Sequence, residues 1–435
     1  MIRHLISVWP SARRPETDRA VKRKSTRNGI TRIRIEERRL ASYPSCSAVD
    51  PTQQVESPAG LYLHFPFCLK KCPYCDFYSI TDLSRKDAYT HALIGEMELL
   101  ASRIDCPFDT VYLGGGTPSI FSGPEIERIL AAARSMFEIS PAAEITLEVN
   151  PGTVTGRSLD AYRQAGVTRL NVGVQSFNDR ILKTLGRIHA AEAAADVLQQ
   201  AIRAGFDYVG LDLIYGIPGQ SMADWQADLE RAARFEIDHL SCYMLSFEPG
   251  TRFDLQRRAG QLHPLPDTRT AAMYKRVVSE LARRGYPQYE ISNFSRPGRH
   301  SRHNVKYWNG VSYTGLGPGA HSFNGATRSW NHRDLDQYIK SISGGNLPVA
   351  GKERLTRSQH MLEAICLGLR TSAGIGKNDF EARFGVDFNH LFGDAVDELR
   401  GRGLFNENKS RLALSAEGML FLDSIVSRMS DQIED

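Results

Sequence analysis

Residues 61–79 read LYLHFPFCLKKCPYCDFYS, a short apolar run rich in β-forming residues that leads directly into a loop with three cysteines. Amphipathic segments with helical spacing separate this run from five more of its kind. The strand-like runs are LYLHF (61–65), TVYLG (110–114), ITLEVN (145–150), RLNVGVQS (169–176), YVGLDLIYG (208–216) and HLSCYMLS (239–246). Strands that alternate with helices predict βα units and a parallel sheet. Six units predict an α/β fold, a partial (β/α)6 TIM-like barrel rather than the complete eight-stranded one.

The composition predicts a soluble globular protein. The chain has 435 residues, of which 41% are hydrophobic and 24% charged, and a net charge of +4. That charge is too small over this length to indicate a nucleic-acid partner, and no apolar run is long enough to predict an integral membrane protein. Seven cysteines, three of them within eight positions, favour a reduced compartment with one metal site. We therefore expect a cytoplasmic protein.

Three regions are expected along the chain. Residues 1–57 hold twelve Lys or Arg against six Asp or Glu and show little periodicity, which predicts a disordered basic extension, with organelle targeting as the alternative. Residues 58–325 form the barrel, and 326–435 a mainly helical, winged-helix-like C-terminal domain. Its expected elements are helices at 356–370, 377–384 and 390–402, a strand at 411–415 and a last helix at 415–429.

The loop after the first strand carries the main chemical signal, the spacing C-x3-C-x2-C. Each iron of a [4Fe–4S] cluster normally takes a thiolate, so three cysteines leave one iron open to a small molecule. A structural zinc site is the competing interpretation, but it wants four ligands, commonly as two pairs. The spacing therefore predicts a cluster on Cys68, Cys72 and Cys75.

This loop, with Tyr74 before the last cysteine, resembles that of the radical SAM superfamily. The resemblance implies that the reduced cluster donates an electron to S-adenosylmethionine, which yields methionine and a 5′-deoxyadenosyl radical. The segment LGGGTPS (113–119) resembles the family's loop for the methionine amino group. Gly115, Gly116 and Thr117 are the matching residues.

Polar residues stand at the ends of the next three strand-like runs. Glu148 suits ribose hydroxyls, and Gln175 with Arg187 suits the carboxylate and ribose of the same ligand. Asp212 lies in the fifth run, before GIPGQ (216–220), which resembles the family's adenine-contacting loop. Each residue alone could serve packing or the surface, but together they predict an S-adenosylmethionine site.

A narrower resemblance covers about 61–423. The segments YLHFPFC, GGGTPS, LEVNP, NVGVQSF, LDLIYGIPGQ and HNVKYW are similar to those of the oxygen-independent coproporphyrinogen III oxidases and of their relatives, the HemW-type haem chaperones. In that group the residue matching Tyr62 contacts S-adenosylmethionine, and a C-terminal domain of this type follows the barrel. The oxidases typically have a fourth cysteine where this chain has Phe77, which favours the chaperones.

The resemblance implies a protein that binds haem and delivers it to haem-dependent respiratory proteins, a membrane enzyme among the possible acceptors. The alternative is an oxidase that decarboxylates coproporphyrinogen III by radical chemistry. The sequence leaves open whether the chain is an enzyme and whether it is a monomer or a homodimer, and it assigns no catalytic residue. His303, in HNVKYW (303–308), is the candidate haem ligand because imidazole commonly binds haem iron. A basic loop with a packed aromatic pair is the alternative for that segment.

Overall fold

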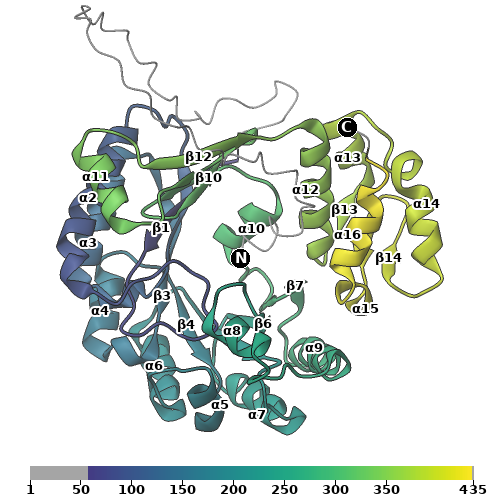
Figure 1. The fold of residues 1–435 in the computed structure, drawn as a ribbon, viewed down its shortest axis with the longest axis horizontal. Coiled ribbons are helices and arrows are strands. Elements are labelled where there is room, and N and C mark those ends of the chain that lie inside the picture. The colour runs from purple at the N-terminus through teal and green to yellow at the C-terminus, as the bar shows by residue number, and fades with distance from the viewer. Residues whose placement is uncertain (1–56, 434–435) are drawn as a thin grey trace, which may run out of the picture. The chain divides into compact units, whose positions relative to one another are not determined.

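A computed structural model describes residues 57–433, so the predicted extension lies almost wholly outside the described residues. Six strands form the centre of one sheet and pair as parallel neighbours in chain order (Figure 1). They are β1 (Ala59–Phe65), β2 (Phe108–Gly115), β3 (Ile139–Val149), β4 (Arg169–Gln175), β5 (Tyr208–Tyr215) and β6 (His239–Met244). The predicted partial barrel is confirmed.

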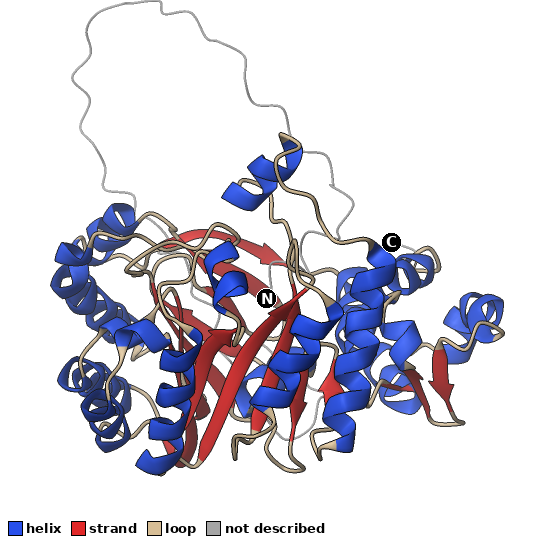
Figure 2. Cartoon of the chain, turned by 90° about the horizontal axis from the view of Figure 1, so that it is seen from below, coloured by secondary structure: helices blue, strands red, loops and turns tan. Residues whose placement is uncertain are grey.

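Helices cover the outer face of the six strands (Figure 2). They are α2 (Lys86–Leu100), α3 (Gly123–Met136), α4 (Gly156–Gln164), α5 (Asp179–Thr184), α6 (Ala191–Ala204) and α7 (Met222–Ala232). Capping boxes fix several of their starts: Ser122 with Glu125 begins α3, and Ser221 with Asp224 begins α7.

Side chains of opposite character line the two faces of the strands. In β1, Leu61, Leu63 and Phe65 are fully buried, and Phe65 contacts Tyr89 of α2 with ring centroids 5.8 Å apart. Tyr62 points the other way, stacks on Tyr112 of β2 and is only partly buried. A complete barrel fills its interior mainly with branched apolar side chains. Here the lumen is polar and partly accessible, as a site for a polar ligand requires.

Further short strands extend the sheet at both edges, and the sequence pattern did not indicate them. Next to β1 lies β9 (Tyr313–Leu316), followed by β10 (His321–Phe323), β11 (Thr327–Asn331) and β12 (Val349–Arg354). Beyond β6 lie β8 (Asn293–Ser295) and β7 (Gln288–Glu290). The connecting helices are α8 (Arg252–Arg258), α9 (Asp267–Arg283), α10 (Arg302–Trp308) and α11 (Leu335–Ser343).

The C-terminal region is mainly helical, as predicted, and also contains a small three-stranded sheet, of which the sequence indicated the strand at 411–415. Its elements are α12 (Arg357–Arg370), β13 (Ile375–Gly376), α13 (Lys377–Phe384), α14 (Phe388–Arg400), β14 (Phe405–Glu407), β15 (Arg411–Leu414), α15 (Ala416–Met419) and α16 (Leu422–Ser430). The sheet order is β13-β15-β14. The single last helix expected at 415–429 is two helices, because the chain leaves helical geometry at Phe421. Within 57–433, no helix is long and apolar enough to cross a membrane.

Candidate metal and cofactor site

The loop that follows β1 carries all three predicted cluster ligands and is closed at its base by backbone hydrogen bonds. The amide of Cys68 donates to the carbonyl of Ile80 at 2.9 Å, and the amide of Ile80 donates to the carbonyl of Pro66 at 2.6 Å. Within the loop, the Cys75 amide donates to the Cys72 carbonyl at 3.2 Å. The chain therefore presents three thiols from one anchored hairpin-like segment, which we call the cysteine loop (66–80).

Polar donors reach two of the three sulfurs. The Thr117 hydroxyl donates to Cys68 Sγ at 3.3 Å, and the Arg187 guanidinium donates to Cys72 Sγ at 3.7 Å. Burial raises the pKa of Cys75 to about 11 and also raises the pKa of Cys68. These thiols therefore lose their protons when a cationic group compensates the charge, as iron does. The donor set fits an iron–sulfur cluster.

The arrangement of the thiols differs from that of a single-ion site. Among the described residues no three His, Cys, Asp or Glu side chains are grouped as one metal ion requires. The thiols of the cysteine loop nevertheless interact electrostatically, Cys75 with both Cys72 and Cys68. Ligands that are close but do not converge on one point suit the corners of a multi-iron cluster better than tetrahedral zinc.

The glycine-rich segment after β2 packs directly against the cysteine loop. The Gly116 amide donates to the Phe65 carbonyl and the Thr117 amide to the Phe67 carbonyl, each at 2.7 Å. A Cβ on Gly116 would lie 2.7 Å from both of those carbonyl oxygens, so no side chain fits there. Gly115 has φ +108°, which only glycine adopts readily. These glycines allow the two loops to approach within hydrogen-bonding distance.

Two carboxylates lie inside the lumen behind this segment. Glu148 accepts hydrogen bonds from the Tyr112 hydroxyl at 2.8 Å and the Gly115 amide at 3.1 Å. Burial, with the nearby charge of Asp212, raises the pKa of Glu148 to about 7. Asp212 accepts from the Asn171 amide at 2.8 Å, and burial raises its pKa as well. Both side chains keep part of their surface accessible, so a ligand in the lumen reaches them.

Gln175 is the last residue of β4, and the side chain of Arg187, which follows α5, reaches the same end of that strand. Arg187 donates to the Gly173 carbonyl at 2.9 Å, and a Cβ on Gly173 would lie 2.9 Å from the Gln175 amide nitrogen. Gln175 is the one non-glycine residue of 57–433 with positive φ, +68°, a conformation that is concentrated at functional sites. Arg187 Nε and Asp212 Oδ1 are buried without a hydrogen-bond partner. Polar groups of a bound cofactor would satisfy these two atoms.

The two predicted tyrosines have different surroundings. The Tyr62 hydroxyl hydrogen-bonds to Nδ1 of His64 at 3.0 Å, inside the lumen. Tyr74 lies with its ring centroid 6.2 Å from that of Phe253 and packs against an apolar cluster of the neighbouring loops. Tyr74 therefore anchors the cysteine loop to its surroundings, whereas Tyr62 faces the lumen.

His303 lies at the opposite end of the strands. It belongs to α10, and its ring lies next to Gly60, at the start of β1, and is 1% exposed. Both ring nitrogens are engaged, Nδ1 with the Thr110 hydroxyl and Nε2 with the Tyr307 hydroxyl, each at 2.9 Å. Burial lowers the pKa of His303 to about 3, so the ring is neutral. In this geometry His303 closes the lower end of the lumen, and neither nitrogen is available to haem iron.

The basic residues of the same helix are also engaged. Arg302 donates to Asp109 at 2.9 Å, and Lys306 lies 2.6 Å from the same carboxylate. The alternative of a basic loop with a packed aromatic pair is therefore only partly right: Tyr307 and Trp308 lie with ring centroids 6.5 Å apart, but the segment is a helix in which His303, Lys306 and Trp308 are buried.

Three lumen residues of the site were not predicted from the sequence: His64, Tyr112 and Asn171. His64 links the Tyr62 hydroxyl to the Tyr78 carbonyl, which its Nε2 contacts at 2.9 Å, and so connects the lumen to the cysteine loop. Tyr112 and Asn171 donate to the two carboxylates. The sequence feature that could have identified these three residues is the period-two alternation of the strands, which places every second residue on the lumen face.

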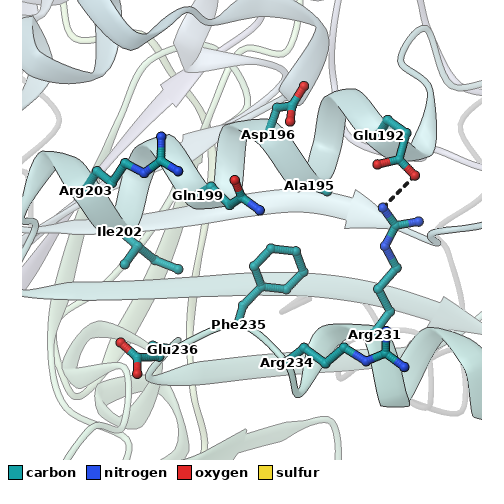
Figure 3. Close-up of a pocket in the computed structure, with 10 residues that line it drawn as sticks. All are labelled: Glu192, Ala195, Asp196, Gln199, Ile202, Arg203, Arg231, Arg234, Phe235 and Glu236. Atoms are coloured by element: carbon teal, nitrogen blue, oxygen red, sulfur yellow. Dashed lines mark hydrogen bonds and ion pairs between the residues drawn. The ribbon is translucent and has the colours of Figure 1, made fainter.

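A separate surface hollow lies on the helical layer, between α6 and the turn after α7. Figure 3 shows that Glu192, Asp196 and Arg203 of α6 border it on one side and Arg231 and Phe235 on the other, and that Glu192 points toward Arg231, with which it pairs at 2.7 Å. Its charged groups are of both signs, and none of the predicted site residues lines it. The chemistry therefore belongs to the strand ends and not to this hollow.

Comparison with known proteins identifies the family to which the chain belongs. Residues 62–232 match the Radical SAM superfamily model and residues 355–421 the HemN C-terminal domain model. The chain is 38% identical to "Heme chaperone HemW" of Mycobacterium tuberculosis over 85% of this chain and 94% of that protein. It is 35% identical to the zebrafish (Danio rerio) "Radical S-adenosyl methionine domain-containing protein 1, mitochondrial", over 88% and 89%. The coproporphyrinogen III oxidase HemN of Escherichia coli, a solved structure, matches with TM-score 0.76 and 25% identity over 86% and 90%.

Proposed function

This chain belongs to the HemW haem chaperone family of radical SAM proteins, and we propose that it binds a [4Fe–4S] cluster, S-adenosylmethionine and haem and passes the haem to haem-dependent respiratory proteins. The observation that carries the proposal is the cysteine loop. It offers three thiols beside a polar lumen, and Phe77 stands where the oxidases typically have a fourth cysteine.

The cofactor assignments follow the contacts of the site. Cys68, Cys72 and Cys75 would hold the cluster, which supplies a redox-active iron with one open position when bound. Thr117 and Arg187 stabilise negative charge on two of the sulfurs through their hydrogen bonds.

S-adenosylmethionine would lie in the upper lumen. Glu148 and Asp212 would accept hydrogen bonds from its hydroxyl and amino groups, and Arg187, whose Nε has no partner, would meet its carboxylate. Gln175 completes the wall next to Arg187, and Tyr62 lines the lumen below Glu148. Because the pKa of Glu148 is raised to about 7, its ability to accept hydrogen bonds from the ligand increases as the pH rises through neutrality.

The oxidase remains the second candidate, because the similarity to the HemN structure extends over both the barrel and the C-terminal region. We place the protein in the cytoplasm, with an organelle as the alternative, since several relatives are described as mitochondrial. The acceptor would be another protein, including a membrane enzyme, and the chaperone itself a monomer or homodimer.

One experiment separates the two functions. The chain is reconstituted anaerobically with iron and sulfide and given S-adenosylmethionine and a reductant. In one arm, coproporphyrinogen III is added and the products are analysed by chromatography. In the other arm, haem-loaded protein is mixed with an apo-haem acceptor and transfer is followed by absorbance. Haem transfer without decarboxylated porphyrinogen is expected, whereas formation of protoporphyrinogen would refute the chaperone assignment.

A further inference from the structure

Large apolar side chains are exposed at one end of the barrel. Six large hydrophobic residues of 57–433 are strongly exposed, and five of them lie at or beyond the carboxyl ends of β1, β4 and β6. The five are Leu69 (48% exposed), Phe77 (50%), Ile188 (41%), Met244 (56%) and Leu255 (59%), and the sixth is Phe421 (47%) in the C-terminal region. Single exposed apolar residues need no explanation, but their concentration on one set of loops indicates an interaction surface.

Contacts between these loops bring them together around the cysteine loop. The Phe253 amide of α8 donates to the Pro73 carbonyl at 2.9 Å, and a Cβ on Gly186 would lie 2.7 Å from the Pro73 ring. Arg187, next to Ile188, donates to Cys72 Sγ. Leu69 and Phe77 are themselves part of the cysteine loop. We call Leu69, Lys70, Lys71 and Phe77 the outer face of this loop.

Cations accompany the apolar side chains on this outer face. Lys70 and Lys71 are exposed, and among the described residues neither has an ion pair with a carboxylate. The Lys71 ammonium donates to the Phe77 carbonyl at 3.3 Å, which holds the charge beside the exposed ring. The nearby carboxylate of Asp254 is engaged already, since it pairs with two arginines of its own helix.

An apolar surface bordered by unpaired ammonium groups complements a flat apolar ligand that carries carboxylates. Haem has this chemistry, since its macrocycle is apolar and its two propionates are anionic. Resting on the proposed function, we propose that haem docks on the outer face of the cysteine loop, with the macrocycle against Phe77 and Leu69 and the propionates on Lys70 and Lys71. The thiols on the inner side of the loop and the haem on its outer side would then share one segment of fifteen residues.

A haemin titration of the full-length, anaerobically reconstituted protein tests the site, with the cluster spectrum subtracted. Phe77→Ser is expected to weaken haemin binding about tenfold, since it removes roughly half the burial of a phenylalanine. Phe421→Ser is the matched control, because it removes an equally exposed phenylalanine from the C-terminal region, and it should leave the affinity unchanged. Cluster absorption equal to that of the unmodified protein shows that each variant has kept its loop.

A second pair of measurements isolates the charge contribution. The double variant Lys70→Glu, Lys71→Glu should bind haemin at least tenfold more weakly, and it should bind haemin dimethyl ester, which lacks the propionate charges, nearly as well as the unmodified protein does. Equal losses for both ligands, or affinities within twofold of the unmodified protein for all variants, would overturn the site while leaving the chaperone function intact. If the variants bind haemin normally but lose self-association in sedimentation velocity, the surface is instead an interface between two copies. An unmodified protein that binds no haemin would overturn the proposed function as well.

Discussion

Glu96, in the middle of α2, is a fully buried carboxylate whose removal should change how stability depends on pH. Its oxygens accept hydrogen bonds from the Gly317 amide at 2.8 Å and from the Tyr338 hydroxyl and the Asn331 amide, both at 2.6 Å. The side chain is 0% exposed, and no cation pairs with it among the described residues. Burial raises the pKa of Glu96 from 4.5 to about 7, against the effect of these hydrogen bonds.

The sign of the effect follows from proton binding. Between pH 4.5 and about pH 7, the folded protein keeps the proton on Glu96 while the unfolded chain has lost it. The folded state then binds more protons, so the free energy of unfolding falls as the pH rises through this window. At about 1.4 kcal/mol for each tenfold change in acid dissociation, the loss from pH 5 to pH 8 amounts to roughly 2–3 kcal/mol.

The assay compares urea unfolding of the unmodified protein and Glu96→Gln at pH 5 and pH 8 under anaerobic conditions. Glutamine, like a protonated glutamate, is uncharged, so in the variant this position no longer makes stability depend on pH. Between pH 5 and pH 8, the free energy of unfolding of the variant should fall by about 2–3 kcal/mol less than that of the unmodified protein. Glu98→Gln, on the exposed side of the same helix, should behave like the unmodified protein. The same pH dependence in Glu96→Gln as in the unmodified protein would refute the reasoning.

Three further predictions concern the site. Cys72→Ala should abolish the cluster's visible absorption after reconstitution, and an iron content that stays at four per chain would contradict the cluster assignment. Glu148→Gln should weaken S-adenosylmethionine binding about tenfold in equilibrium dialysis, the loss of one charge-assisted hydrogen bond; unchanged affinity would remove Glu148 from the site. His303→Ala should lower the free energy of unfolding by about 2–4 kcal/mol, since it opens a cavity and leaves Thr110 and Tyr307 unpartnered, while haemin affinity stays the same. A lost Soret band in a stable His303→Ala protein would instead make His303 the haem ligand.

The barrel was predictable because each of its strands carries a long enough pattern. In β1, apolar Leu61, Leu63 and Phe65 alternate with Tyr62 and His64, and the five further strand-like runs recur with helices between them. The strands at the edges of the sheet were not predicted from the sequence, and the reason is physical. β7 and β8 have three residues each, too few to show a period. The pairing of β8 with β6, and of β7 with β8, arises from tertiary contact rather than local preference.

The residues of the site also fall into two groups, those that a local motif predicts and those whose position depends on tertiary contacts. Residues on the loops after strands, such as Cys68 and Thr117, have motifs that can be seen locally, and the structure brings them together. The local sequence could not predict where His303 lies in the fold, because HNVKYW shows only that a histidine is close in sequence to aromatic and basic residues. Whether that helix lies on the surface or closes the lumen depends on Gly60 and Thr110, about two hundred residues earlier in the chain.

The position of His303 also bears on how such a protein could use a cluster without being an enzyme. With α10 closing the lower end of the lumen, the described contacts that link the lumen to a surface pass through the cysteine loop: His64 connects Tyr62 to the Tyr78 carbonyl, and Arg187 connects the end of β4 to Cys72. A cluster and a nucleotide bound inside would therefore fix the conformation of the segment whose outer face carries Phe77 and the two lysines. Ligands that bind inside and haem that binds outside would then be coupled through one loop, and by linkage each would change the affinity of the other by the same factor.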